Sequence, residues 1–464
     1  MKKSILMVFS TNLLKTLSVL IVSFFVPSLL SLGEYADYKL FGLYASYIGV
    51  AHFGFYDGMF LHYGGKTLED HRGQASREVS GLACLELIIS LGLITYGCIA
   101  GNMIFTALGL DILPVILVTY FAMVYQAVGE FSAYSKIYTG KALLELLTGL
   151  VLVFLVKKDS GMLFVFNSVA VEWVIALYAV WAYAKKYPLR AEKPDARLMS
   201  SMMRAGILLM IGNMSYILFG SIDKWFVKLL METDHFAYYS FAVQLLSALN
   251  MFVTPISLTL YSYLSRRKSS SFEYDLKTVI LALLFFMLGG VFVIRFILSH
   301  YLQKYLPAEN VIIILFMAQV FSLLNTSIYV NLFKTYKMQR KYFRNLAAIM
   351  GVSVAANAAA FFLVQRSMES IASATLASMV LWALLNLRSF GYLKLRVRHL
   401  LFPLGMIPVY FLCSALPVLS GLAAYWAAWW IALRLLMPSV YRLGLQEAKN
   451  LRDKLIHRKG RLPS

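Results

Sequence analysis

The chain has 464 residues, of which 60% are hydrophobic and 14% are charged, and its mean hydropathy is +0.70. A water-soluble protein of this length does not have such a composition, so most of the chain is predicted to lie inside a lipid bilayer. A formal net charge of +20 would indicate nucleic-acid binding in a soluble protein, but here the basic residues gather in short segments between apolar runs. This distribution indicates membrane topology and excludes nucleic acid as the predicted partner.

Apolar runs follow one another along almost the whole chain, and about fourteen are long enough to cross a bilayer. The runs are continuous rather than alternating, so they predict transmembrane helices and not a barrel. The predicted spans are 5–30, 41–63, 79–106, 113–134, 141–157, 162–184, 205–231, 237–264, 277–300, 309–333, 346–365, 369–393, 402–418 and 420–437. The first run is too long for a signal peptide, so we expect it to be retained. The predicted fold class is an all-α polytopic membrane protein.

The spans divide into two similar sets of six, with two more at the end. The most basic internal loop, 185–204, separates the sets, and Asn213 repeats in the seventh span the place of Asn12 in the first. Transporters built from internal repeats have this layout. The predicted parts are an N-terminal lobe over 1–200, a C-terminal lobe over 201–400, two additional helices over 401–437 and a basic cytoplasmic tail over 438–464.

The distribution of Lys and Arg predicts the orientation. Most of the 43 basic residues fall on one side of the membrane when the N-terminus is placed in the cytoplasm. Basic residues are enriched in cytoplasmic loops, so both termini are predicted to be cytoplasmic.

Sequence motifs for enzymatic chemistry are absent. The chain has no P-loop, C-x-x-C, H-E-x-x-H, G-x-S-x-G or dinucleotide fingerprint, so we expect neither ATP hydrolysis nor a bound cofactor. Its three cysteines lie in apolar runs and predict no disulfide or metal site. Glu34 and Asp37, in the first exterior loop, keep open the alternative of a membrane glycosyltransferase or polymerase. The loops are too short for a catalytic domain, so a non-enzyme is favoured.

Several polar side chains fall within the spans, where a charge costs about 3 kcal/mol or more. Lys15 lies roughly 15 Å along the first span at 1.5 Å per residue, on the same helix face as Asn12. Asp57 lies in the second span, and Asn213 and Lys224 share a face of the seventh. We expect these five residues to line a substrate cavity, with the lysines binding phosphate.

Four buried carboxylates are candidates for coupling transport to a gradient of H⁺ or Na⁺. A poorly solvated carboxylate exchanges a proton or cation more readily than one in water. These candidates are Glu86, Glu130, Glu172 and Asp223. The alternative is structural, with each acid paired to a lysine and the pairs holding the bundle together.

Residues 54–66, GFYDGMFLHYGGK, resemble the corresponding segment of bacterial polysaccharide repeat-unit (oligosaccharide) flippases. These belong to the multidrug/oligosaccharidyl-lipid/polysaccharide exporter superfamily, whose span layout the whole chain resembles. The resemblance implies a V-shaped bundle that alternates between inward and outward openings, and an undecaprenyl-diphosphate-linked oligosaccharide as substrate. Family members line the cavity with charges from spans one, two, seven and eight, and Lys15, Asp57 and Lys224 occupy such positions. The uncharged eighth span departs from that pattern.

The predicted function is therefore a flippase in the bacterial plasma membrane that supplies capsule, exopolysaccharide or O-antigen synthesis. Its expected partners are the lipid-linked oligosaccharide, membrane lipids, a polysaccharide polymerase and glycosyltransferases. A cation-coupled multidrug antiporter of the same fold is the main alternative.

Overall fold

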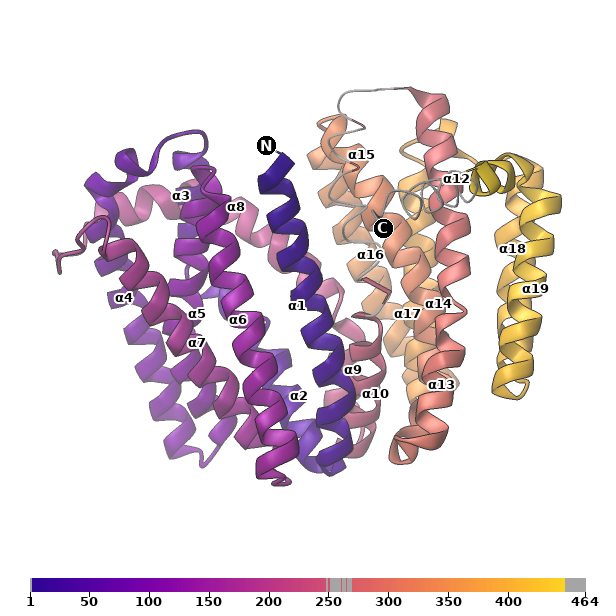
Figure 1. Ribbon diagram of the computed structural model, residues 1–464, viewed down its shortest axis with the longest axis horizontal. Helices are drawn as coiled ribbons and strands as arrows, with labels where there is room; N and C mark the ends of the chain where they lie inside the picture. Colours follow the sequence, from indigo (N-terminus) through magenta and orange to yellow (C-terminus); the bar gives the residue numbers. More distant parts are fainter. Residues whose placement is uncertain (1, 248, 251–259, 261–263, 265–268, 447–464) are drawn as a thin grey trace, which may run out of the picture. The chain divides into compact units, whose positions relative to one another are not determined.

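The computed structural model describes residues 2–247, 249–250, 260, 264 and 269–446, and the regular secondary structure within them is entirely helical (Figure 1). Among these residues, twelve helical segments are long and apolar enough to cross a membrane. The predicted all-α, polytopic fold is thereby confirmed.

The chain forms two compact units, residues 1–251 and 252–464. The helices of the first unit are α1 (Lys2–Leu29), α2 (Leu32–Ala45), η1 (Ile48–Val50), α3 (Phe55–Tyr63), α4 (Leu68–Ile99), α5 (Met103–Ala127), α6 (Phe131–Val151), η2 (Leu152–Val156), α7 (Gly161–Ala184), α8 (Ala196–Phe219), α9 (Ile222–Leu230) and α10 (Thr233–Leu245).

The second unit is also helical throughout its described residues. Its helices are α12 (Ser270–Met287), α13 (Gly290–His300), η3 (Gln303–Ala308), α14 (Glu309–Leu324), η4 (Asn325–Tyr329), α15 (Val330–Thr335), α16 (Gln339–Ala359), η5 (Ala360–Val364), α17 (Met368–Leu387), η6 (Gly391–Leu393), α18 (Val397–Ser414) and α19 (Val418–Leu436). The predicted lobe boundaries at 200 and 400 stay predictions.

Two predicted spans are broken in the structure. The span predicted over 41–63 is divided between α2 and α3, and Gly54 at the break has a φ of +84° that favours glycine. The span predicted over 205–231 is divided between α8 and α9 at Gly220. Discontinuous helices of this kind are common where transporters place their binding sites.

Part of the eighth predicted span lies outside the described residues. Helix α10 accounts for its first part, whereas residues 251–259 and 261–263 are not described. Of the predicted tail over 438–464, residues 447–464 are likewise outside the described part of the chain.

Glycines allow α3 to pack directly against α8. A Cβ atom built at Gly58 would overlap the carbonyl oxygen of Met202, and one at Gly206 would overlap the backbone of Gly54 and Gly58. Only residues without a side chain permit the two backbones to approach this closely. Two glycines of the GFYDG sequence therefore fix the contact that positions Asp57.

The two units each contain the same helical irregularity. In the first unit the 21 residues of α6 continue into five π-helical residues, η2. In the second unit the 21 residues of α16 continue into five π-helical residues, η5, and both segments end in Phe-Leu-Val. A π-helical segment is rare, so its recurrence at the same place supports an internal repeat.

Candidate functional site

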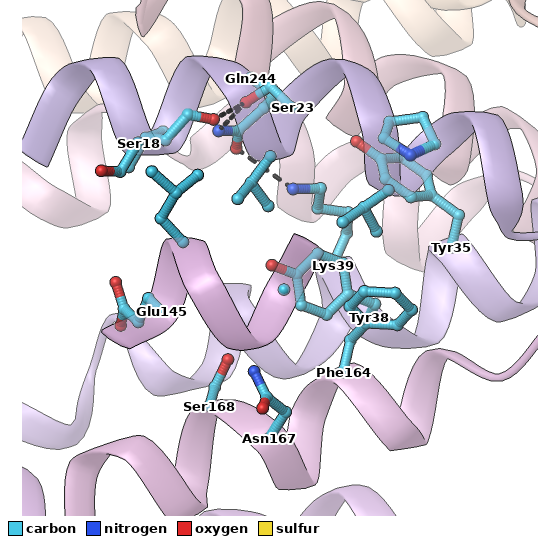
Figure 2. A pocket seen from close by; sticks show the side chains of 16 residues that line it. Ser18, Ser23, Tyr35, Tyr38, Lys39, Glu145, Phe164, Asn167, Ser168 and Gln244 are labelled. Carbon is cyan, nitrogen blue, oxygen red and sulfur yellow. Dashed lines mark hydrogen bonds between the residues drawn. The ribbon is translucent and has the colours of Figure 1, made fainter. Parts of the chain in front are cut away.

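The first unit encloses a cavity of about 280 Å³ between α1, α2, α6, α7 and α10. Its polar lining is labelled in Figure 2 and consists of Ser18, Ser23, Tyr35, Tyr38, Lys39, Glu145, Asn167, Ser168 and Gln244. The cavity volume suits a phosphate group or a single sugar ring rather than a whole oligosaccharide. By the predicted orientation, it lies in the exterior half of the membrane.

Lys39 of α2 supplies the positive charge of this cavity. Its Nζ donates a hydrogen bond of 3.2 Å to Oε1 of Gln244, whose Nε2 donates one of 2.8 Å to the Ser23 hydroxyl (Figure 2). The amine also lies 5.1 Å and 4.8 Å from the ring centroids of Tyr35 and Tyr38. In the described part of the chain no carboxylate lies within ion-pair distance of Lys39. An amine held by a neutral amide and by aromatic faces is able to bind an anion.

A second charged group adjoins the cavity through Glu145. Lys141 of α6 pairs with Glu172 of α7 and lies 3.8 Å from Glu145, one helical turn along. Asp111 of α5 is also an electrostatic neighbour of Lys141. Lys141 therefore interacts electrostatically with three carboxylates of the first unit. Glu172 is the ion-pair partner of Lys141 and not an isolated acid.

Lys15 and Asn12 lie on α1, outside the cavity lining. Lys15 is exposed on the surface of the unit, with its Nζ 5.2 Å from the centroid of the Tyr138 ring. Lys141 and Glu145 are its electrostatic neighbours. The Lys15 amine is thus outside any salt bridge among the described residues, and its electrostatic neighbour Glu145 also lines the cavity.

The structure places Lys224 and Asp223 in the first turn of α9, just after the break in the seventh span. The Asp223 carboxylate is buried and accepts hydrogen bonds from the Lys224 backbone amide at 2.8 Å and from the Tyr239 hydroxyl at 2.8 Å. The Lys224 amine is half-buried and acts electrostatically on Lys39. Asn213, two turns before the break, is exposed. Lys224 is therefore associated with the cavity lysine, whereas Asp223 is engaged within the bundle.

Asp57 and Glu86 lie together in the interior near α3. Asp57 is buried, with its Oδ2 3.7 Å from Nε2 of His52, whose ring stacks on Tyr56. Glu86 of α4 is fully buried, and neither carboxylate oxygen has a hydrogen-bond partner among the described residues. Both acids are electrostatic neighbours of Tyr56. A buried carboxyl group without a partner is costly to ionise, so Glu86 stays a candidate for proton exchange.

Glu130 takes a different position from these acids. It is exposed at the residue that precedes α6, where it lines a separate cavity of about 260 Å³ at the predicted cytoplasmic end.

Lys39, Lys141 and Asp111 were absent from the predicted set. Hydropathy assigns Lys39 to an exterior loop, because Glu34 and Asp37 closely precede it. The spacing of four residues between Tyr35 and Lys39 could have indicated that both lie on one face of a helix. Asp111 falls between two predicted spans but lies inside the single helix α5.

Glu34 has a structural contact. Its Oε2 accepts a hydrogen bond of 2.5 Å from the backbone amide of Gly161, at the start of α7. A carboxylate at a helix N-terminus is stabilised by the unpaired amides there. This contact accounts for Glu34 without a catalytic role.

The cavity thus lies in an all-α chain with many apolar helices of membrane-spanning length. Residues 66–268 match the family described as polysaccharide biosynthesis protein. The structure resembles that of the lipid II flippase MurJ in an inward closed conformation, with a TM-score of 0.67 and 12% identity over 94% of this chain and 99% of that one. It also resembles an inward-facing multidrug resistance MATE family transporter of the MOP superfamily, with a TM-score of 0.52 and 8% identity over 84% of this chain and 95% of that one. Comparison with curated proteins returns no match.

The chain therefore shares the fold of these two proteins, and twelve helical segments among its described residues are long and apolar enough to cross a membrane.

Proposed function

We propose that the protein translocates undecaprenyl-diphosphate-linked oligosaccharide repeat units across the bacterial plasma membrane, from the cytoplasmic to the exterior leaflet. Both termini are cytoplasmic, and the exported units supply capsule, exopolysaccharide or O-antigen synthesis. The family match to polysaccharide biosynthesis and the flippase fold support this class of substrate.

The observation that carries the proposal is the Lys39 amine, which lines the cavity and has no carboxylate within ion-pair distance among the described residues. A charge in the membrane interior is costly, so a lysine without an acidic partner indicates an anionic ligand. Lys224 lies close enough to repel Lys39, and a diphosphate would relieve that repulsion. The neighbouring tyrosines and amides offer stacking and hydrogen bonds to the first sugar.

Transport proceeds by alternating access and is coupled to an ion gradient. Lys15 and Lys224 contact the diphosphate as it moves, and Lys39 holds it within the exterior half of the first unit. Glu86, Glu172 and Asp223 are the interior carboxylates through which H⁺ or Na⁺ exchange is coupled. The polyprenyl tail remains in the lipid. Glycosyltransferases assemble the repeat unit before translocation, and a polymerase joins the exported units after it.

Replacing Lys39, Lys15 or Lys224 singly by alanine is expected to lower translocation about 10- to 100-fold, because each change removes one charge-assisted hydrogen bond to diphosphate. Translocation is measured in proteoliposomes that contain a fluorescent polyprenyl-diphosphate oligosaccharide, by the loss of label from one leaflet. Polymer export in cells that express each variant supplies the second measurement.

Lys158→Ala is the matched control, because Lys158 is exposed in the loop after η2. It should translocate as the unchanged protein does, and Lys39→Arg should retain more activity than Lys39→Ala. Normal translocation by all three alanine variants, at normal membrane levels, would exclude the diphosphate role of these lysines.

The likeness to a MATE transporter gives the second candidate, a cation-coupled multidrug antiporter. Overexpression would then protect drug-sensitive cells against cationic drugs, and polymer export would be independent of the protein. The uncompensated lysine disfavours this candidate, because a cationic drug would be repelled by it.

A further inference from the structure

A second polar cluster lies in the first unit, away from the cavity of Lys39. It comprises five side chains from α3, α4, α5 and α7, each at most 1% exposed, namely Tyr63, His71, Glu78, Tyr120 and Tyr183. The predicted function uses none of them. A histidine and a carboxylate buried together are costly unless their hydrogen bonds are complete.

Glu78 accepts two of these bonds. Tyr63 donates to its Oε1 at 2.7 Å, and Tyr120 donates to its Oε2 at 2.7 Å. Nε2 of His71 lies 2.8 Å from the Tyr120 hydroxyl and 3.4 Å from the Glu78 carboxylate. The Tyr120 hydroxyl has a single proton, which it donates to Glu78, so Nε2 of His71 must carry the proton that bonds to Tyr120.

The other side of His71 is able to accept one more proton. Nδ1 lies 2.7 Å from the Tyr183 hydroxyl, and this hydroxyl has no other hydrogen-bond partner among the described residues. When Nδ1 is unprotonated, Tyr183 donates to it; when Nδ1 is protonated, the hydroxyl rotates and accepts. Both states keep every bond without moving a heavy atom, and protonation changes the pair of His71 and Glu78 from one net negative charge to zero.

A path for the proton begins at the same tyrosine. Tyr183 lines the cavity of about 260 Å³ that also contains Glu130 and Lys186 at the predicted cytoplasmic end. Tyr187, one turn further along, donates a hydrogen bond of 2.7 Å to Glu69, and this bond raises the pKa of its hydroxyl. The cluster therefore adjoins a polar cavity through Tyr183.

The surroundings of the cluster are otherwise neutral or distant from His71. In the turn after α3, the Lys66 amine lies 5.3 Å from the centroid of the Tyr63 ring. The Gln74 side-chain amide of α4 lies 3.1 Å from the Tyr63 hydroxyl. Tyr125 of α5 and Tyr187, just after α7, contact the Tyr183 ring. Glu78 is the carboxylate in contact with His71 within the described residues, so it sets the charge state of the imidazole.

We propose that His71 and Glu78 form a one-proton site that loads and releases its proton through Tyr183 and the cytoplasmic cavity lined by Glu130. This site supplies the proton coupling of the proposed transport function. Its coupling role rests on that function, whereas the existence of the proton site does not. A proton that enters from the exterior during transport leaves to the cytoplasm by this route.

The existence of the site is tested on the protein alone. The full-length chain is prepared in lipid nanodiscs with ¹⁵N-labelled histidine, and the His71→Gln variant identifies the His71 signals among those of the seven histidines. The pH is varied between 4 and 9, and we expect the His71 signals to change from those of a ring protonated at Nε2 alone to those of a ring protonated at both nitrogens. Glu78→Gln should lower the midpoint of this change, because the carboxylate that stabilises the imidazolium is gone. Tyr183→Phe should lower it as well, since the protonated Nδ1 loses its acceptor.

Tyr410→Phe is the control for loss of a buried hydroxyl. Tyr410 is as deeply buried, but its hydroxyl donates to the backbone carbonyl of Ile313 in the second unit. The midpoint of His71 should be unchanged in this variant. A His71 that keeps one protonation state across this pH range, or a midpoint unaffected by both Glu78→Gln and Tyr183→Phe, would overturn the proposal.

The coupling role is tested in proteoliposomes with a pH gradient of either sign. The unchanged protein should translocate the lipid-linked oligosaccharide faster when the gradient drives protons toward the cytoplasmic face. His71→Gln and Glu78→Gln should lose this acceleration and keep the slower rate seen without a gradient. An acceleration that survives in both variants would remove the cluster from the coupling. If the unchanged protein translocates nothing, the proposed function fails, while the titration still decides whether the proton site exists.

Discussion

Replacing Gly206 by alanine is expected to lower the stability of the first unit by about 3 kcal/mol, at the upper end for overpacking. The added Cβ would overlap the backbone of Gly54 and Gly58, and a backbone cannot give way as a flexible side chain can. The α3–α8 contact must then open, which also displaces Asp57. The measurement is thermal unfolding in detergent, where a decrease of about 5–10 °C is expected.

Gly92→Ala is the matched control for this prediction. Gly92 lies within α4, and a Cβ there meets no atom within 4 Å. Alanine favours helix over glycine by up to about 1 kcal/mol, so this variant should unfold at the same or a higher temperature. Gly58→Ala should resemble Gly206→Ala, because it places a Cβ against the carbonyl of Met202. Equal melting temperatures for Gly206→Ala and Gly92→Ala would contradict this prediction, because they would show that the contact between α3 and α8 accommodates the added Cβ without loss of stability.

The fold was predictable because the bilayer imposes a simple rule on the sequence. Every backbone group in hydrocarbon must be paired within the chain, so a long apolar run is a helix almost irrespective of its detail. The predicted spans over 162–184 and 369–393 accordingly correspond to α7 and α17. The same rule says nothing of where a helix breaks, because the backbone at Gly54 and Gly220 is determined by packing.

Helix ends outside the apolar runs were less predictable. The third span was placed from residue 79, but α4 begins at Leu68, where Thr67 and Asp70 form a capping box. This longer helix brings His71 and Glu78, seven residues apart, onto one face. The capping motif is visible in the sequence, whereas the tyrosines that complete the cluster come from three other helices.

None of the five predicted substrate-binding residues lines the cavity of Lys39. Depth along a span indicated Lys15, but depth does not say toward which neighbours a side chain points. Lys39 was assigned to a loop because Glu34 and Asp37 interrupt the apolar sequence before it. The cavity around Lys39 is formed by five helices, so it could not be predicted from the sequence near this residue. The predicted roles of Lys15 and Lys224 stay predictions.

Replacing Lys141 by methionine is expected to destabilise the first unit by about 3–5 kcal/mol, because it leaves buried carboxylates without a cation. Glu172 would lose its ion pair, and one of its oxygens already has no hydrogen-bond partner among the described residues. Asp111 and Glu145 lose the same compensating charge. Thermal unfolding in detergent measures the effect. It should shrink as the pH falls, because a protonated carboxyl group carries no charge to compensate.

A double-mutant cycle separates the ion pair from the packing of the lysine side chain. Glu172→Gln alone leaves Lys141 with Glu145 at 3.8 Å, so it should cost less than Lys141→Met. Lys141→Met combined with Glu172→Gln removes one buried charge of each sign and should recover the part of the lost stability that belongs to this pair, while Asp111 and Glu145 stay without the lysine. If the double variant is as unstable as the sum of the single variants, Lys141 acts through its aliphatic packing, and the charge balance of the first unit does not depend on this pair. If it recovers, the salt link is replaceable in stability. Lys141 and Glu172 can then be removed together without loss of the fold, and their role in translocation can be measured in a stable protein.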